Sequence, residues 1–104
     1  MALTHEYRRT VLDKLKRNRS AARALYVAAL NELLHNKVAE GLLLLRDLVH
    51  AGITFKELVR RTGFGEKALH RMLSRRGNPT TRNLVVVLKV IAADLGVRSH
   101  LKLA

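Results

Sequence analysis

The sequence contains no cysteine, few aromatic residues and no long apolar run. Without cysteine the chain can form no disulfide bond, no thiolate metal site and no catalytic thiol, which fits a reducing cytoplasm. Aromatic residues make up 4% of the 104 residues but hydrophobic residues 48%, so Leu, Val and Ala must build the core. The leucine run at 42–45 ends at Arg46 and is far too short to span a bilayer. The start, M-A-L-T-H-E-Y-R-R, lacks the apolar centre of a signal peptide, and we expect a cytoplasmic protein.

Residue patterns that carry catalysis or bind metal ions are missing as well. The five histidines are scattered along the chain, at positions 5, 35, 50, 70 and 100, and no two have the spacing of metal ligands. There is no G-x-S-x-G, no P-loop and no pair of carboxylates, and the G-F-G at 63–65 is typical of a turn between helices. We therefore expect that the protein is not an enzyme and that it binds no metal ion and no cofactor.

Acidic residues are greatly outnumbered by basic ones. Twenty Lys plus Arg against eight Asp plus Glu give a formal charge of +12 and a pI near 11.4. From Lys56 to Arg82 there are eight basic and two acidic residues, which leaves +6 on this stretch. A concentrated positive field attracts phosphate and releases condensed counterions. Charge alone also fits a solvated basic surface that only keeps the protein in solution.

Apolar residues recur with a helical period nearly throughout the chain, which predicts an all-α fold. We expect six helices, at about residues 4–16, 21–34, 38–50, 54–61, 66–73 and 82–95. Residues 97–103 alternate between apolar and polar; a frayed end is favoured there, and a short strand is the alternative.

Residues 54–73, T-F-K-E-L-V-R-R-T-G-F-G-E-K-A-L-H-R-M-L, follow the pattern of a DNA-binding helix-turn-helix. Thr54 can cap the first short helix and Gly63 can end it in a left-handed conformation. The second helix has an apolar face and a polar, mostly basic face, which suits the major groove. The apolar face holds Ala68, Leu69, Met72 and Leu73, and the polar face holds Glu66, Lys67, His70, Arg71 and Ser74.

Three stretches carry a resemblance to a known family: S-A-A-R-A-L-Y-V-A-A-L, L-L-L-L-R-D-L-V-H-A, and E-L-V-R-R-T-G-F-G-E-K-A-L-H-R-M-L-S-R-R-G-N-P-T-T-R-N-L. From about Ala21 to Val97 the chain resembles the antidote (antitoxin) proteins of addiction modules, which carry a phage-repressor-type (Xre-like) helix-turn-helix. The resemblance implies a bundle of about five helices, often dimeric, that binds operator DNA. It also implies neutralisation of a toxin encoded alongside, commonly an endoribonuclease.

This resemblance suggests a five-helix phage-repressor-like domain at residues 38–96, a two-helix extension at 1–37 packed on the same domain, and a tail at 97–104. The extension could serve as additional core, as a dimer interface or as a surface that grips a toxin, and additional core is favoured.

The chain also departs from the family. Phe55 replaces a glutamine that contacts the DNA backbone in many relatives, and we expect it to pack inward. Val59 stands where relatives usually have Ala, and Gly65 replaces the usual Ser or Thr cap. After the second helix, Gly77 suits a positive φ, and Thr80 or Thr81 can cap the last helix.

We assign candidate roles from chemistry and position, with simple solvation as the alternative for each basic residue. Arg and Lys can address guanine in the major groove, whereas hydroxyls, cations and free N–H groups at a helix start bind phosphate. The base-contact candidates are Lys67, His70 and Arg71. The phosphate-contact candidates are Lys56, Arg60, Ser74, Arg75, Arg76, Thr80, Thr81 and Arg82. A second apolar face of the last helix, Val86, Val90 and Ala93, is covered either by the chain itself or by a dimer or other partner.

The function favoured by the sequence is a sequence-specific DNA-binding transcriptional regulator, the antitoxin of a type II toxin-antitoxin module that represses its own operon. It would act in the cytoplasm, on the nucleoid, as a homodimer with two recognition helices about 34 Å apart. One alternative is a stand-alone or phage-derived repressor without a toxin. Another is a protein-binding module that has kept the fold but lost operator binding.

Overall fold

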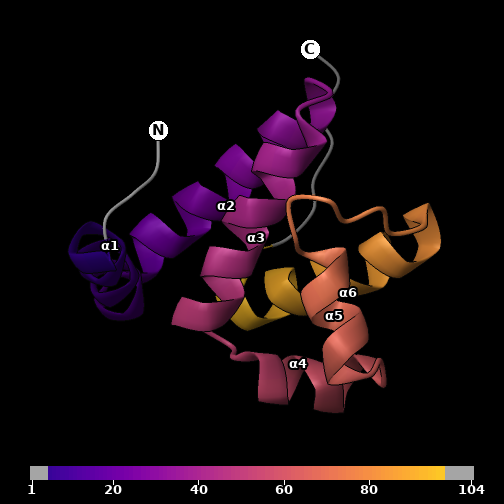
Figure 1. Cartoon of the computed structure of the whole chain (residues 1–104). Coiled ribbons are helices and arrows are strands. Elements are labelled where there is room, and N and C mark those ends of the chain that lie inside the picture. The colour runs from indigo at the N-terminus through magenta and orange to yellow at the C-terminus, as the bar shows by residue number, and fades with distance from the viewer. Residues whose placement is uncertain (1–4, 98–104) are drawn as a thin grey trace.

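Six α-helices form the part of the chain that the computed structural model describes, residues 5–97, with side chains described from residue 9 onward. No strand occurs in this range, so the predicted all-α class is confirmed. The expected helix start at residue 4 and the alternatives for the tail, beyond residue 97, lie outside the described residues. The helices are α1 (His5–Arg17), α2 (Arg19–Leu34), α3 (Val38–Ala51), α4 (Phe55–Thr62), α5 (Glu66–Met72) and α6 (Thr81–Leu95) (Figure 1).

The helix ends are set by local signals in the sequence. The Thr54 hydroxyl accepts a hydrogen bond from the Glu57 N–H at 3.3 Å, and the Thr80 hydroxyl accepts one from the Asn83 N–H at 3.2 Å. Both satisfy an N–H group that has no partner inside its helix. The residues that follow α4 and α6, Gly63 and Gly96, are left-handed, with φ of 77° and 71°. The predicted cap at Thr54 and the predicted helix end at Gly63 are confirmed, and of the two candidates for the cap of the last helix it is Thr80 that caps it.

Gly77 is required for a different reason from the one predicted. Positive φ among the described glycines is confined to Gly63 and Gly96, so the prediction of a positive φ at Gly77 is wrong. A Cβ atom there would instead lie 2.2 Å from the carbonyl oxygen of Met72. The loop after α5 doubles back so closely on the end of that helix that only a residue without a side chain fits.

One core is shared by five of the helices, α2 to α6. Its fully buried side chains include Leu42 and Leu45 of α3, Leu58 of α4, and Leu69 of α5. The second helix belongs to this core, to which it contributes Ala22, Tyr26 and Ala29. Residues 38–96 contain four helices, α3 to α6, so a body of five helices is reached only when α2 is included. Outside that body lies α1, whose buried apolar side chain among the described residues is Leu15.

Helix α2 is tied to the last helix by three long-range hydrogen bonds. The Tyr26 hydroxyl donates to the Leu88 carbonyl at 3.1 Å, and burial raises the pKa of this tyrosine. Arg19 donates to the Asp94 carbonyl at 2.7 Å and Arg23 to the Leu95 carbonyl at 3.2 Å. The two guanidinium groups therefore satisfy carbonyls at the C-terminus of α6, where the helix dipole also favours positive charge.

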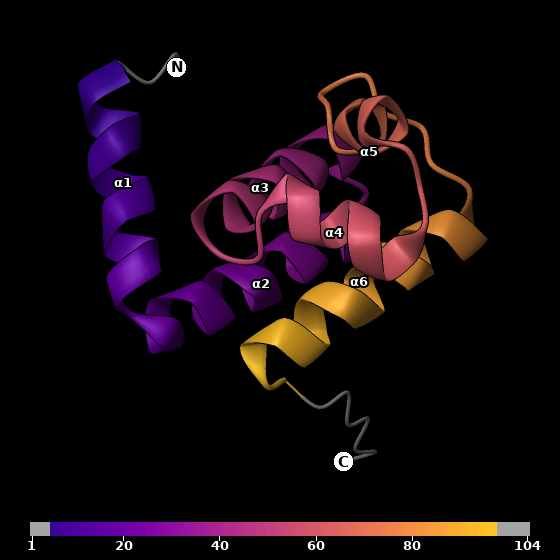
Figure 2. The same cartoon turned by 90° about the horizontal axis from the view of Figure 1, so that it is seen from below.

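The two short helices form a corner on the opposite side of the molecule from α1. In Figure 2 α5 is seen nearly end-on whereas α4 runs across the view, so their axes cross steeply. The same view has α1 at one end of the molecule and α5 at the other. Within residues 5–97 no helix is both long and apolar enough to cross a membrane.

Candidate nucleic-acid interface

A turn of three residues, 63–65, joins α4 to α5, and hydrogen bonds fix its geometry. The Thr62 hydroxyl donates to the Leu58 carbonyl at 2.7 Å and accepts from the Phe64 N–H at 3.1 Å. Phe64 itself packs against the core. The start of α5 is thereby held at a set position relative to α4, as a protein surface that inserts a helix into a groove requires.

Helix α5 divides into a buried face and an exposed face as its sequence predicts. Leu69 of α5 and Leu73, which follows it, are fully buried. Lys67 and Arg71 are exposed on the other side, with Glu66 in the first turn of the helix. A seven-residue helix cannot persist alone in water, so the two leucines hold it in place while its cationic side chains stay accessible.

His70, the third base-contact candidate, lies in an aromatic contact that the sequence did not reveal. Its imidazole stacks on the ring of Phe55, and the centroid of His50 lies 6.2 Å away. His70 is half-buried, and its Nε2 lies 3.7 Å from a carboxylate oxygen of Glu66. Phe55 is 6% exposed, so the prediction that it packs inward is confirmed. One face of the His70 ring is therefore occupied by Phe55.

Arg71 shares an open cleft with the start of α6. The cleft has a volume of about 260 Å³ and lies between α5 and the residues that lead into α6. Thr81 and Arg82, in the first turn of α6, are both exposed. Helix starts present unpaired N–H groups and a positive dipole end, which are suited to a phosphate. The residues lining the cleft are Ala68, Arg71, Met72, Asn78, Pro79, Thr80 and Asn83.

The remaining phosphate-contact candidates differ in how far they are available. Lys56, Arg75 and Arg76 are exposed on α4 and on the loop after α5. Ser74 is half-buried, and its hydroxyl donates to the Arg71 carbonyl at 2.8 Å, so it can only accept from a further donor. Ser74 therefore stabilises the end of α5 rather than offering a proton to DNA.

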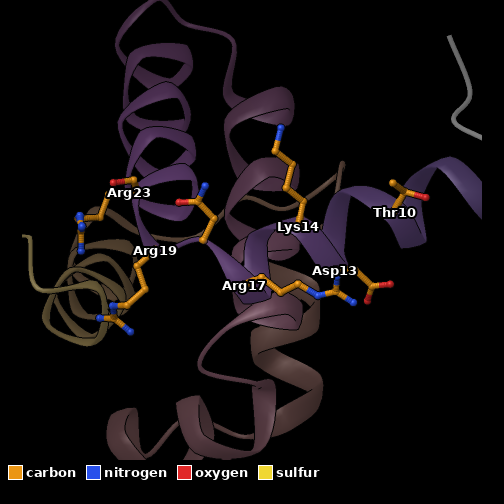
Figure 3. Close-up of a pocket in the computed structure, with 8 residues that line it drawn as sticks. Thr10, Asp13, Lys14, Arg17, Arg19 and Arg23 are labelled. Atoms are coloured by element: carbon orange, nitrogen blue, oxygen red, sulfur yellow. The ribbon is translucent and has the colours of Figure 1, made fainter.

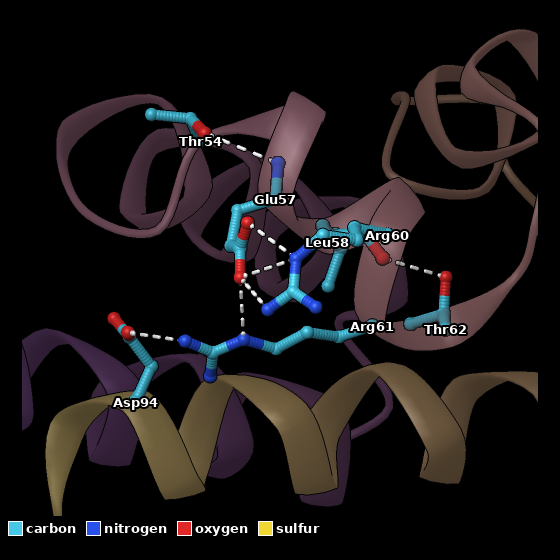
Figure 4. A network of polar contacts seen from close by, with 7 residues as sticks. All are labelled: Thr54, Glu57, Leu58, Arg60, Arg61, Thr62 and Asp94. Atoms are coloured by element: carbon cyan, nitrogen blue, oxygen red, sulfur yellow. Dashed lines mark hydrogen bonds and ion pairs between the residues drawn. The ribbon is translucent and has the colours of Figure 1, made fainter.

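Arg60 is held by a carboxylate on its own helix (Figure 4). Its Nε donates to both carboxylate oxygens of Glu57, at 3.0 and 2.9 Å, and Arg61 donates to the same group at 3.0 Å. The hydrogen bonds from Arg60, and next those from Arg61, lower the pKa of Glu57 to about 2. Arg61 also reaches Asp94 of α6, with the charged atoms 3.8 Å apart. The charge of Arg60 is thus offset, which leaves it a weaker partner for phosphate than Lys56.

The second apolar face predicted for α6 is covered in part by the chain itself. Val90 packs against the core and Val86 is half-buried, whereas Ala93 is exposed. The large apolar side chain that α6 exposes most among the described residues is Val85, at 45%.

No group of three or more His, Asp or Glu side chains within the described residues could hold a metal ion. Family models, curated proteins and solved structures were all compared with the chain, and none matches it.

Proposed function

We propose that the protein is a sequence-specific DNA-binding regulator in which α4 and α5 form a helix-turn-helix and α5 enters the major groove. The observation that carries this proposal is the two-sided α5: Leu69 is fully buried at its back, while Lys67 and Arg71 are exposed at its front. A short, rigidly held helix with a cationic front is the shape and charge that the major groove accepts.

The phosphate contacts of this proposal lie on both sides of α5. On one side are Arg75, Arg76 and the start of α6, which shares a cleft with Arg71. On the other side is Lys56 at the start of α4. Contacts on both flanks of an inserted helix fix its register on the duplex, and the base contacts of Lys67 and Arg71 then supply the sequence preference.

We further propose that the protein is the antitoxin of a type II toxin-antitoxin module, that it represses its own operon and that it acts as a homodimer. This part rests on the resemblance in residues 21–97. A homodimer would address two half-sites about 34 Å apart on one side of the duplex. A gene for a small toxin next to the coding sequence would support this role, and its absence would favour a stand-alone repressor.

The test is binding of the purified protein to its own upstream DNA and to an unrelated duplex of equal length, each titrated against salt. We expect a preference of about 10³-fold or more for its own upstream DNA. With about six phosphates neutralised, log affinity should fall against log salt concentration with a slope near −5. Equal and weak binding to both duplexes would overturn the proposal and would direct the search to a protein partner.

A further inference from the structure

A second basic surface lies where α1 meets α2. It is an open cleft of about 780 Å³, shown in Figure 3. Four cations line it, and one acid, Asp13, stands among them. Its lining residues are Thr10, Asp13, Lys14, Arg17, Asn18, Arg19, Ser20 and Arg23. We call this surface the α1–α2 corner.

The charge of the α1–α2 corner is concentrated and only partly used within the protein. Its lining has four basic side chains and one acidic side chain, which leaves +3, and Arg9 and Lys16 on α1 bring the charge of residues 9–23 to +5. Arg19 and Arg23 each donate one bond to the end of α6 and keep their other N–H groups. The side chains of Lys14 and Arg17 are exposed and have no hydrogen-bond or ion-pair partner in the described part of the chain. Such a cluster attracts a polyanion.

The α1–α2 corner is too far from α5 to belong to the candidate nucleic-acid interface. Arg19 and Arg23 contact the C-terminal end of α6, whereas the cleft beside Arg71 adjoins the N-terminal end of that helix. The 15 residues of α6 span about 22 Å at 1.5 Å per residue. Figure 2 shows the same separation, with α1 and α5 at opposite ends of the molecule. A ligand at the α1–α2 corner therefore contacts a different stretch of polyanion.

The chemistry of the lining favours a nucleic-acid backbone over a protein. Protein interfaces have an apolar centre with aromatic anchors and few charges, and no large apolar side chain lines this cleft. Phosphate contacts to DNA come from Arg, Lys, Ser, Thr and Asn side chains and from N–H groups at helix starts. Here Lys14 and Arg17 lie beside Ser20 in the first turn of α2. The cleft is also too open to enclose a small molecule.

We propose that the α1–α2 corner is a second, sequence-independent DNA-binding site that holds the phosphate backbone of another duplex, or of a distant segment of the same DNA. It rests on the proposed function, because a bridge needs the first duplex to be bound at α5. One protein molecule would then join two stretches of DNA, one recognised by sequence and one by charge.

The test uses the double variant Lys14→Ala with Arg17→Ala. Its matched control, Lys37→Ala with Lys89→Ala, removes the same charge from two exposed lysines that do not line the cleft. Upstream DNA is fixed to beads, protein is added, and capture of a labelled, unrelated duplex is measured. We expect capture by the wild type and the control, and capture reduced about tenfold in the Lys14/Arg17 variant, with upstream-DNA affinity and melting temperature kept. If the protein compacts one long DNA but captures no separate duplex, the α1–α2 corner binds a distant segment of the DNA that is already bound at α5.

Capture that survives in the Lys14/Arg17 variant would overturn this inference. If the Lys14/Arg17 variant keeps capture of DNA but no longer binds polyglutamate, the inference is also overturned, because the partner would then be an acidic protein segment. A second measurement separates this failure from that of the proposed function: binding of the unrelated duplex to Lys67→Ala with Arg71→Ala, which removes the two proposed base contacts and keeps the α1–α2 corner. Adding the Lys14 and Arg17 changes to that background should reduce the salt slope by about 2, and an unchanged slope would also contradict the inference.

Discussion

The imidazole of His70 on α5 stacks on the ring of Phe55 on α4, with centroids 3.9 Å apart and planes 14° apart. His50, from the last turn of α3, lies on the same cluster, 4.9 Å from the Phe55 centroid. Three consecutive helices therefore meet at one aromatic contact, which sets the angle at which α5 is presented. In this arrangement His70 positions α5 through its ring face.

That role distinguishes two substitutions of His70. His70→Phe keeps the stack and removes the ring nitrogens, so we expect melting temperature and upstream-DNA affinity close to wild type. His70→Ala removes the stack and should lower the free energy of unfolding by about 1 kcal/mol. Chemical denaturation and a DNA titration measure both quantities. If His70→Phe folds normally but loses sequence preference, His70 contacts a base through its nitrogens instead.

Arg71→Ala tests the proposed base contact most directly. Its side chain is exposed, so we expect an unchanged melting temperature. Loss of a bidentate guanine contact should weaken upstream-DNA binding by about 1–3 kcal/mol and relax the preference at one base position. Lys89→Ala removes one charge from an exposed position on α6 and serves as the control. Equal losses in the two variants would reduce the role of Arg71 to general charge.

Thr54 combines a cap with an unfavourable backbone conformation. Its φ of 76° and ψ of 152° lie in a region that glycine adopts and β-branched residues avoid. Thr54→Ala loses the cap and keeps the strain, which should cost about 1 kcal/mol of stability. Thr54→Gly loses the same hydrogen bond but relieves the strain, so it should be more stable than the alanine variant by about 1 kcal/mol. Thermal unfolding of both variants measures this difference. An alanine variant more stable than the glycine variant would contradict the strained conformation of Thr54.

Glu57 makes the stability of the protein depend on pH in the acid range. Its pKa in the folded protein, about 2, lies below its ordinary value of 4.5, so its interactions stabilise the protein above pH 4.5. As the pH falls from 4.5 toward 2 the carboxylate is protonated and that contribution is lost. Glu57→Gln should melt lower than wild type near neutral pH and match it near pH 2. If wild type and Glu57→Gln still differ in melting temperature by the same amount near pH 2, the ion pairs of Glu57 are not the source of that difference.

Gly77 is expected to tolerate no side chain. In Gly77→Ala the new Cβ would meet the Met72 and Arg71 carbonyl oxygens, at 2.2 and 2.8 Å, and the loop would have to shift. We expect a loss of about 1–3 kcal/mol in the free energy of unfolding. Gly65→Ala is the matched control because nothing lies within 4 Å of its Cβ position. Equal stability of the two variants would show that the loop moves without cost.

Much of the fold could be predicted from sequence because its signals are local. The caps at Thr54 and Thr80, the stops at Gly63 and Gly96 and the apolar faces of the helices depend on neighbours within one or two turns. Each observed helix begins and ends within about two residues of its predicted bounds, and the buried back of α5 was predicted as well.

The features that were missed depend on which helix packs on which. The His70–Phe55 stack joins two helices, and the need for glycine at position 77 arises from a carbonyl oxygen five residues away. The share of α2 in the core follows from contacts with α3 and α6 that periodicity alone does not reveal. The pairing of Arg60 with Glu57 could have been found, because a spacing of three residues places both side chains on one side of α4.

The hydrogen bonds between α2 and α6 join residues that are 62 to 75 positions apart. Single helices form in about a microsecond, but a contact of this span closes only after most of the chain has been brought together. Because Tyr26 and Leu95 belong to the same core as Leu69, completion of this closure and fixing of α5 are parts of one folding event. A protease cut inside α6 should therefore release the helices at residues 55–72 as well, although that cut leaves their own residues intact.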